Sequence, residues 1–537
     1  MKVGDAALCA AAAGAAAVAV AFTWQPGLAS LFDDSVSYLL LAQAASPFGS
    51  ATPAALAAAA QEKYPPLLGW LVALAGGAFD WRIAHAVVAI AFGVSVLALG
   101  WHARAVTGLP ALGAAAALVY ALMPGAWLNV KGILSEFPYM ALSFAAMAVH
   151  ASRRGTVLAP ARAATLGALL AAAFLTRTIG VALIAAILAF EASRYLRERD
   201  RRRLVGLAWI IGVPMLAGAL WYALRPAAGE DAYVSFGSQV AREASSGGAA
   251  FALQLAGANA AALRDAWLTA LIVFWGEPWK PGFLLASAIG IAGALAGLVR
   301  AARGEADGLY AIAFVGILLA WPFPGQMFRL ALPILPLLLV FFLWGWWRIL
   351  ERYSPADASR RAAYAVVLPL AVCLPPTLFY VAPRAASDES SGRLRHGHIA
   401  EYYRIPSGGA AAANAAAQIG VFEDLARVGE TTPPGARVAW FWPSYVALLA
   451  GREGVRLERA GDRASMARQL SESGAHFVYM AELHPRDSAG RDGHPLASLP
   501  FALELGRPVW HRASPAGTIQ GVLVEIDEAK VRAALKQ

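Results

Sequence analysis

Charge and cysteine are both scarce in this chain. Of its 537 residues, 15% are charged and 59% are hydrophobic, whereas soluble proteins carry roughly 25% charged residues. Its two cysteines, Cys9 and Cys373, both lie inside apolar segments, which argues against a disulfide framework and against a cysteine-ligated zinc site. With a mean hydropathy of +0.54, the composition indicates a membrane protein that crosses the bilayer several times.

The net charge is +9, yet it is not accompanied by a nucleic-acid-binding motif. Lys and Arg residues gather between the apolar segments, where the preference of basic loops for the cytoplasm explains them. The C-terminal part has no glycine-rich phosphate loop. We therefore expect no nucleic acid as a partner and no need for a soluble nucleotide.

Apolar stretches of about 15 to 20 residues can cross the bilayer as helices. The sequence contains about eleven of them, near 5–23, 83–102, 109–128, 137–151, 161–176, 178–193, 204–224, 281–300, 308–323, 330–348 and 362–382. The first could instead be a cleaved signal peptide, but its length and the acidic loop directly after it favour retention.

The apolar run 65–79 decides the orientation of everything that follows it. If this run spans the membrane, Arg153, Arg154 and the basic block 194–203 face outside, against the positive-inside tendency. If it lies in the interface, these basic loops are cytoplasmic. We therefore predict an interfacial or re-entrant 65–79, a cytoplasmic N-terminus, and a long outer loop over 225–280.

The chain changes character near residue 384. Residues 1–383 are predicted to form a transmembrane domain, whose first extracytoplasmic loop, 24–82, carries amphipathic helices. A polar and then Gly/Ala-rich linker covers 384–417. Residues 418–537 alternate helix-like and strand-like segments, with strands predicted at 437–441, 476–480 and 522–526, which is typical of a small α/β domain. The predicted class is thus a polytopic α-helical protein of the inner (plasma) membrane with a C-terminal α/β extracytoplasmic domain.

Two adjacent carboxylates, Asp33 and Asp34, follow the first predicted helix at the membrane surface. Because two neighbouring carboxylates cannot both ionise cheaply near a low-dielectric surface, we expect one to act as a base and the other to be paired or metal-bound. Either could instead be the N-cap of a helix over 35–45. Tyr38, one turn further on, would share a face with Asp34.

Glu136 opens a predicted membrane helix at the same outer surface. The helix dipole alone could explain an acidic residue there, or Glu136 could be a second acid in the same cavity, because ionisable groups at membrane depth are expensive elsewhere.

Several cations lie on the outer side, against the positive-inside tendency; they are Lys63, Lys131, Arg177 and Arg329. Because Lys and Arg both bind phosphate, an anionic lipid phosphate is the ligand that we predict for them. Arg329 could instead be a helix-end residue that reaches the interface, and Arg177 could be part of a simple turn.

In their order along the chain, these motifs resemble those of the GT-C superfamily of membrane glycosyltransferases, in the branch of aminoarabinose transferase and the protein O-mannosyltransferases. The motifs are Asp33-Asp34-x-x-x-Tyr38, Lys63-Tyr64-Pro65-Pro66-Leu67, Ser135-Glu136, Thr176-Arg177 and Arg329-x-x-x-Pro333. The segment Val438–Gly454 resembles part of the extracytoplasmic domain of bacterial members.

The resemblance implies transfer, with inversion, of a sugar from a polyprenyl-phosphate donor to a hydroxyl of an extracytoplasmic acceptor, which is a lipid, a glycan or a protein. By position, Asp33 is the expected base and Asp34 its partner, while Lys63 or Tyr64 is expected to meet the donor phosphate. Metal use varies within the superfamily, so a divalent metal ion is left open.

Two other functions stay open at this point. One is a transporter or flippase of a lipid-linked or anionic substrate, against which stand the absence of an obvious internal repeat and the gathering of polar candidates at one surface. The other is a non-catalytic scaffold, in which Asp33 and Asp34 would tolerate substitution together.

Overall fold

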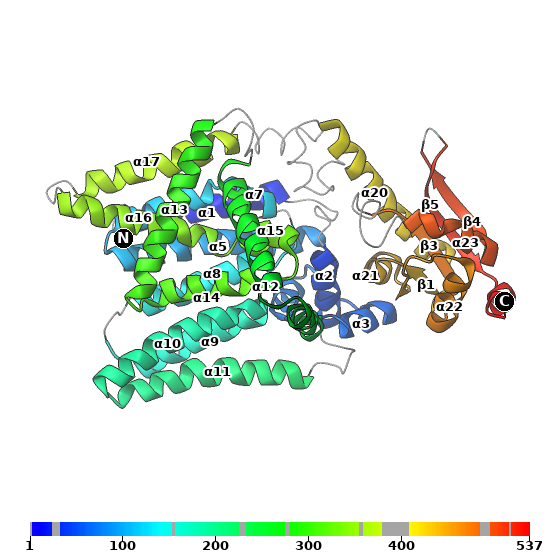
Figure 1. Cartoon of the computed structure of the whole chain (residues 1–537), viewed down its shortest axis with the longest axis horizontal. Coiled ribbons are helices and arrows are strands. Elements are labelled where there is room, and N and C mark those ends of the chain that lie inside the picture. Colours follow the sequence, from blue (N-terminus) through cyan, green and yellow to red (C-terminus); the bar gives the residue numbers. More distant parts are fainter. Residues whose placement is uncertain are drawn as a thin grey trace. The chain divides into compact units, whose positions relative to one another are not determined.

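The computed structural model describes residues 3–23, 33–130, 132–152, 156–224, 232–273, 280–353, 358–378, 408–483, 495–514 and 517–536. Contacts divide the chain into two units, whose helices and strands are labelled in Figure 1. The first comprises Met1–Trp24, Lys63–Leu68 and Arg82–Ala386, and the second comprises Gln25–Glu62, Gly69–Trp81 and Ser387–Gln537. The first loop therefore belongs largely with the C-terminal part, a grouping that the prediction did not make; the predicted domain boundaries stay a prediction.

The described part of the first unit is helical. Its helices are α1 (Val3–Thr23), α5 (Trp81–Thr107), α6 (Pro110–Ala121), α7 (Pro124–Val130), α8 (Glu136–Ala151), α9 (Pro160–Thr176), η1 (Thr178–Gly180), α10 (Val181–Glu198), α11 (Arg202–Leu224), α12 (Ala232–Ile272), α13 (Lys280–Ala302), α14 (Ala306–Leu319), η2 (Pro324–Gln326), α15 (Met327–Leu330), α16 (Leu335–Tyr353) and α17 (Ala358–Pro376). Proline is the first residue of α6, α7 and α9, where its missing N–H is not needed and its fixed φ suits the helix.

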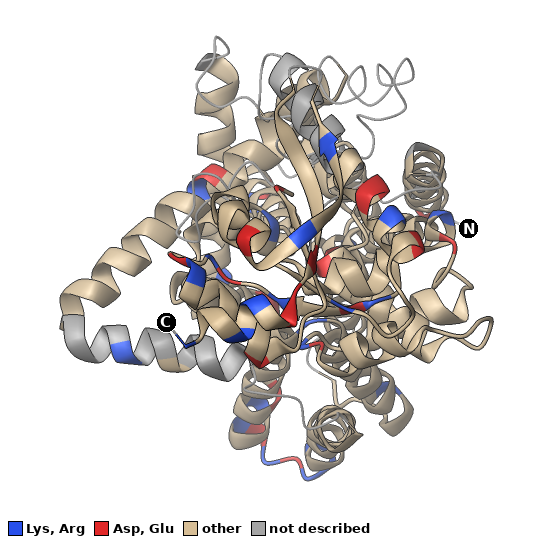
Figure 2. Ribbon diagram, turned by 90° about the vertical axis from the view of Figure 1, so that its right-hand side faces the viewer, with Lys and Arg blue, Asp and Glu red and all other residues tan. Residues whose placement is uncertain are grey.

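Four described helical segments are long and apolar enough to cross a membrane: Trp81–Thr107, Thr178–Glu198, Arg202–Leu224 and Pro281–Ala302. The number rises to six if two bent pairs each count as one span, namely α6 with α7, bent by 55°, and η2–α15 with α16, bent by 63°. The predicted helical class is confirmed, whereas the count of eleven spans stays a prediction. Most of the ribbon in Figure 2 carries neither acidic nor basic side chains, in keeping with the low charge of the sequence.

The predicted outer loop 225–280 and the predicted interfacial run 65–79 both contain helices. The segment predicted as a long outer loop contains α12, an alanine-rich helix that is kinked at Gly248, where φ is 61°; alanine is the strongest helix former. Within the run 65–79, only α4 (Leu67–Leu74) is an α-helix. Eight helical residues extend about 12 Å, less than half of the roughly 30 Å hydrocarbon core, so α4 cannot span it alone.

The second unit is built on a five-stranded sheet in the order β2-β1-β3-β5-β4. Its elements are α2 (Asp33–Ala45), α3 (Pro53–Ala60), α20 (Gly408–Thr431), β1 (Arg437–Trp440), α21 (Pro443–Tyr445), η6 (Val446–Ala450), β2 (Glu453–Arg456), α22 (Arg463–Ser473), β3 (Phe477–Ala481), η8 (Pro495–Ser498), α23 (Leu499–Leu505), β4 (Gly506–Ala513), β5 (Ile519–Ile526) and α24 (Glu528–Ala534). Strand β1 runs parallel to β2 and β3, while β5 runs antiparallel to β3 and β4. The predicted small C-terminal sheet domain is thus present.

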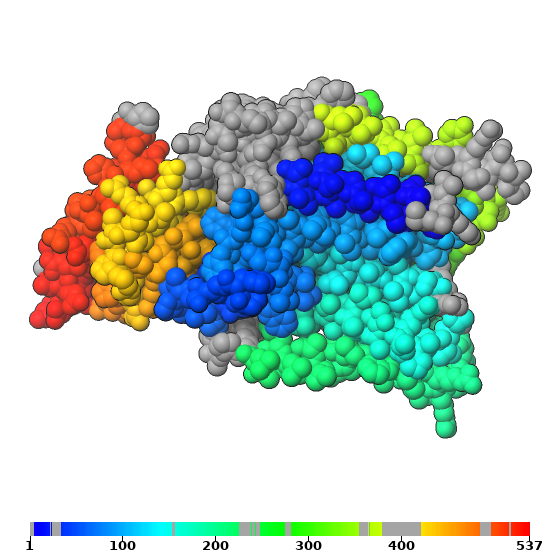
Figure 3. All heavy atoms as spheres, turned by 180° about the vertical axis from the view of Figure 1, so that it is seen from behind, coloured from blue at the N-terminus to red at the C-terminus, as the bar shows by residue number. Residues whose placement is uncertain are grey.

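The sheet has a separate apolar core on each face. One core joins α22, α23 and α24 to residues of β3 and β5, such as Val478 and Val524. The other contains Trp440 of β1 and Tyr445 of α21 together with Leu40 of α2 and Ala59 of α3. Figures 1 and 3 show these first-loop helices, in blue, beside the elements of residues 420–460. Helices from the start of the chain therefore complete the core of a domain from its end.

Candidate functional site

Glu136 is the centre of a buried ionic cluster in the first unit. It is the first residue of α8, after Ser135 at the N-cap position, and its side chain is 1% exposed. A carboxylate that is removed from water to this degree is stable only when cations or hydrogen-bond donors compensate its charge. Two arginines from distant parts of the sequence supply that charge.

Arg177 reaches Glu136 from the connection between α9 and η1. Its backbone is extended, with φ −150° and ψ 130°, and ends α9. Its Nη1 lies 2.5 Å from Oε1 of Glu136 and donates to Oγ of Ser135 over 3.2 Å. The reversal is tight, since a Cβ atom on Gly180 would come within 3.0 Å of the backbone of Phe174. The small residue therefore lets α10 begin where Arg177 can turn back towards α8.

Arg329 comes from the break between α14 and α16. It lies in the four-residue helix α15, which follows the proline-led turn η2. Its Nε is 3.3 Å from Oε1 of Glu136. The side chains of Arg177 and Arg329 are 13% and 17% exposed, against 1% for Glu136. The carboxylate is therefore enclosed, while the side chains of both arginines are partly exposed.

Two guanidinium groups lie within ion-pair distance of the Glu136 carboxylate. The planar donors of arginine match the oxygens of phosphate or carboxylate.

Aromatic side chains hold the start of α8 in place. The ring of Phe137 packs edge-on against Phe92 of α5 at 5.1 Å between centroids, and Phe92 in turn contacts Trp127 of α7. One turn along α8, the hydroxyl of Tyr139 lies 3.0 Å from that of Tyr310 on α14, and both residues are fully buried. These contacts fix the backbone that carries Glu136.

The remaining predicted cations are not all described. Lys63 and Tyr64 belong to the first unit, where the ammonium of Lys63 lies 5.4 Å from the centre of the Tyr64 ring. The two residues predicted as alternative phosphate contacts therefore form a cation–π pair with each other. Lys131 lies outside the described residues.

The acidic pair belongs to the second unit. Helix α2 begins at Asp33, whose side chain lies outside the described part of the structure. Asp34 is partly exposed and lies in the first turn of α2, where a carboxylate is favoured by the helix dipole. Tyr38 is 2% exposed. The roles predicted for these three residues stay predictions.

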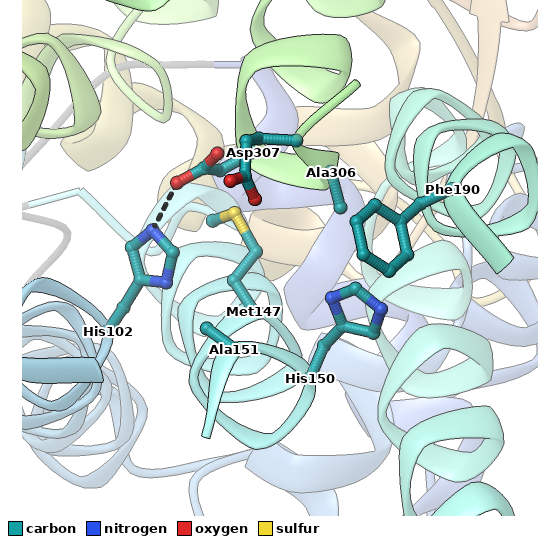
Figure 4. Close-up of a pocket in the computed structure, with 8 residues that line it drawn as sticks. His102, Met147, His150, Ala151, Phe190, Ala306 and Asp307 are labelled. Atoms are coloured by element: carbon teal, nitrogen blue, oxygen red, sulfur yellow. Dashed lines mark ion pairs between the residues drawn. The ribbon is translucent and has the colours of Figure 1, made fainter. Parts of the chain in front are cut away.

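A second set of polar residues, which sequence reasoning had not predicted, lies at the opposite end of the helices. His102 of α5 is 3.2 Å from Asp307 of α14 (Figure 4), and Arg300 of α13 donates to both oxygens of Asp307 at 2.7–3.1 Å. Nearby on α8, His150 is 3.1 Å from Glu191, which also accepts from Arg203 over 2.9 Å.

His102, Asp307 and His150 border one small pocket, which is lined also by Met147 and Phe190 (Figure 4). Glu136 lies in the first turn of α8 and His150 in its last, so polar clusters bind the helices together at both ends. The sequence feature that could have predicted these polar residues is the position of acidic and basic residues at the ends of apolar helices. Among the described residues, no group of three His, Cys, Asp or Glu side chains is placed to hold a metal ion.

Comparison with known proteins identifies the fold. No protein-family model matches the chain, and neither does any curated protein. The oligosaccharyltransferase of Archaeoglobus fulgidus in the apo form superposes with a TM-score of 0.54 at 13% identity, over 98% of this chain and 75% of that one. ArnT from Cupriavidus metallidurans in the apo state gives 0.50 at 14% identity, over 96% of this chain and 97% of that one.

The chain has the GT-C fold. The resemblance that the sequence motifs predicted is therefore confirmed at the level of the fold. The four to six described helical segments that are long and apolar enough to cross a membrane support a multi-pass membrane protein.

Proposed function

We propose that the protein is a membrane glycosyltransferase that moves a sugar from a polyprenyl-phosphate donor to a hydroxyl of an acceptor outside the cytoplasm, with inversion. The observation that carries the proposal is the convergence of the guanidinium groups of Arg177 and Arg329 on Glu136 in a protein of the GT-C fold. A structure of A. fulgidus AglB with an inhibitory peptide and a dolichol-phosphate, similar at a TM-score of 0.52 and 13% identity, supports a lipid phosphate as the ligand class.

In the proposed reaction, the acceptor oxygen attacks the anomeric carbon while the bond from that carbon to the phosphate oxygen breaks. The acceptor proton passes to Asp33, and Asp34 orients that carboxylate. Negative charge grows on the leaving lipid phosphate, and Arg177, Arg329 and Lys63 or Tyr64 stabilise it, with Lys131 as a further contact. Preorganised cations at the place where charge develops lower the barrier of such a step.

Glu136 takes a different part from the base. Its carboxylate is enclosed and lies within ion-pair distance of both arginines. Glu136 is therefore a poor candidate for the general base that accepts the proton of the acceptor hydroxyl. We propose that it holds the two guanidinium groups side by side, at a separation at which both reach one phosphate group. Without it, like charges would repel each other.

The proposed orientation has the N-terminus in the cytoplasm, and the first loop and the C-terminal domain outside. This arrangement keeps the basic segment 194–203 in the cytoplasm, as the positive-inside tendency requires. Acceptor and reacting sugar would then meet on the outer side of the inner membrane.

The test is transfer by purified, reconstituted protein from a panel of radiolabelled polyprenyl-phosphate sugars to a membrane extract. Wild type is compared with Asp33→Asn and Asp34→Asn, and Asp80→Asn, in the same loop, is the matched control. We expect loss of about 100-fold or more for the variant that lacks the general base, with the control unchanged. Anomeric configuration of the product, read by NMR, tests inversion.

Two outcomes would contradict the proposal. If both Asn variants transfer as well as wild type, the assignment of the base is wrong. The second outcome is that no donor is used under any condition, including added or chelated divalent metal. The protein would then be better explained as a transporter or flippase of a lipid-linked or anionic substrate. The next measurement would be the flux of the lipid across the membrane of vesicles.

A further inference from the structure

Asn259 is a buried amide in the middle of α12. Its side chain is 0% exposed, in a stretch of α12 that otherwise presents small apolar residues. Both hydrogens of its amide are used: Nδ2 donates to the carbonyl of Leu319 over 2.9 Å and to the carbonyl of Trp321 over 2.7 Å.

These two carbonyls belong to the end of α14. Leu319 is the last residue of that helix and Trp321 follows its C-cap. Carbonyls in the last turn of a helix have no partner within the helix, so the amide of Asn259 supplies from a neighbouring helix what α14 cannot. The place where α14 stops is therefore tied to α12.

The chain that leaves this point leads directly to Arg329. The indole of Trp321 donates to Gln326 over 3.3 Å across the turn η2, and α15 begins with the next residue. Met327 and Leu330, on either side of Arg329, are 1% and 8% exposed, and α15 packs along α12. Both ends of the segment that carries Arg329 are thus fixed to the same helix.

Asn259 has both a cost and a benefit for stability. Its Oδ1 is buried without a hydrogen-bond partner in the described structure, and an unsatisfied buried acceptor is destabilising. Leucine has nearly the same size and would remove that penalty, but it would offer no donor to the carbonyls of Leu319 and Trp321. What asparagine adds is a pair of donors with a fixed separation, aimed at two carbonyls of one turn.

We propose that Asn259 is a positioning residue for Arg329. By clamping residues 319–321, it sets the distance between the guanidinium of Arg329 and the carboxylate of Glu136, and so the fit of both arginines to one phosphate. This inference rests on the proposed function, because it takes the lipid phosphate as the ligand.

The experiment measures binding of polyprenyl phosphate without a sugar to the reconstituted full chain, next to KM and kcat for transfer. Asn259→Leu should raise the dissociation constant about tenfold, the equivalent of one lost hydrogen-bond contribution, and should raise the donor KM by the same factor. In an Arg329→Ala background the same substitution should have little further effect, because residues that act through one another are not additive.

Thr377→Val is the matched control. Thr377 is also buried and donates to a carbonyl just past the end of a helix, that of Leu122 after α6, over 2.7 Å. It should lower thermal stability without moving the dissociation constant. If Asn259→Leu does not fold, Asn259→Ser, which keeps one donor, is measured in its place and should give a smaller shift in the same direction.

The outcomes separate this inference from the function on which it rests. Failure of wild type to bind polyprenyl phosphate would overturn both. If wild type binds and Arg329→Ala does not, but the Asn259 variants bind as wild type does, the lipid-phosphate site stands and the positioning role is wrong. An effect that simply adds to that of Arg329→Ala would also overturn it.

Discussion

At the scale of single residues, the Glu136 cluster is asymmetric in its burial. The carboxylate is enclosed, whereas the side chains of Arg177 and Arg329 are partly exposed. Removal of the anion leaves cations that water can still solvate in part, while removal of the cations leaves a buried anion alone. Removal of both arginine charges should therefore destabilise the protein much more than removal of the carboxylate, although the arginine side chains are the more exposed ones.

We accordingly predict an order of stability among variants. Glu136→Gln should destabilise the protein by about 1–2 kcal/mol, below the roughly 3–5 kcal/mol typical of an uncompensated buried charge. Arg177→Gln combined with Arg329→Gln should reach that larger value. Thermal unfolding of the detergent-solubilised chain measures both, and a smaller effect for the double arginine variant would show that Glu136 is not the enclosed partner.

Asp424 of α20 offers a pH-dependent prediction in the second unit. Burial raises the pKa of its carboxyl, although hydrogen bonds from Tyr479 and Arg512 oppose the shift. An acid whose folded pKa is raised binds more protons in the folded state, so its contribution to stability is present below the unfolded pKa and is lost as the pH rises through the folded pKa.

Asp424→Asn should remove this dependence. Between the normal carboxyl pKa and neutral pH, the wild-type unfolding temperature should fall more steeply than that of the variant. The measurement is the melting temperature of the full chain over that pH range. A variant whose curve falls in parallel with wild type would rule out Asp424 as the titrating group.

At the scale of elements, the sequence indicated most apolar helices, although it did not predict α12, and it did not indicate which elements pack together. The parallel strands β1 and β3 coincide with short apolar runs, and both were predicted. Strand β4 was missed because Pro508 and charged residues interrupt its pattern, and only pairing with β5 makes it a strand. Likewise, Glu136, Arg177 and Arg329 were each proposed from local motifs, but nothing local says that one carboxylate holds both arginines.

The packing of α2 against the sheet gives an element-scale prediction. Leu40 is 0% exposed within the core that contains Trp440 and Tyr445, whereas Leu56 of the neighbouring α3 is 47% exposed. Leu40→Ala should lower the free energy of unfolding by about 3 kcal/mol, and the matched Leu56→Ala by under about 0.5 kcal/mol. Chemical denaturation followed by tryptophan fluorescence measures both; equal effects would mean that α2 does not belong to this core.

At the scale of the whole molecule, the C-terminal domain is incomplete without the first loop. A fragment of residues 408–537 would leave one face of its sheet without α2 and α3, so we expect it to be unstable alone. Addition of a peptide of residues 33–60 should raise its melting temperature, because a ligand at 100 times its dissociation constant contributes about 2.7 kcal/mol.

The control is the same peptide with serine in place of Val36 and Leu40, which should have no effect. A fragment that melts cooperatively, with a melting temperature that neither peptide changes, would show that the domain folds without the first loop. The prediction of separate domains in the sequence analysis followed chain order, and chain order is a poor guide when segments from both ends of the sequence share one core.

That shared core also means that α2 and α3 are synthesised long before the sheet against which they pack. Residues up to 60 leave the ribosome about 377 residues before Arg437 begins β1, and at 5–20 residues per second this interval lasts roughly 20–75 s. For that time the apolar faces of α2 and α3 have no sheet to cover them. The nascent loop must therefore be sheltered by the bilayer surface or by a chaperone until the last fifth of the protein has been made.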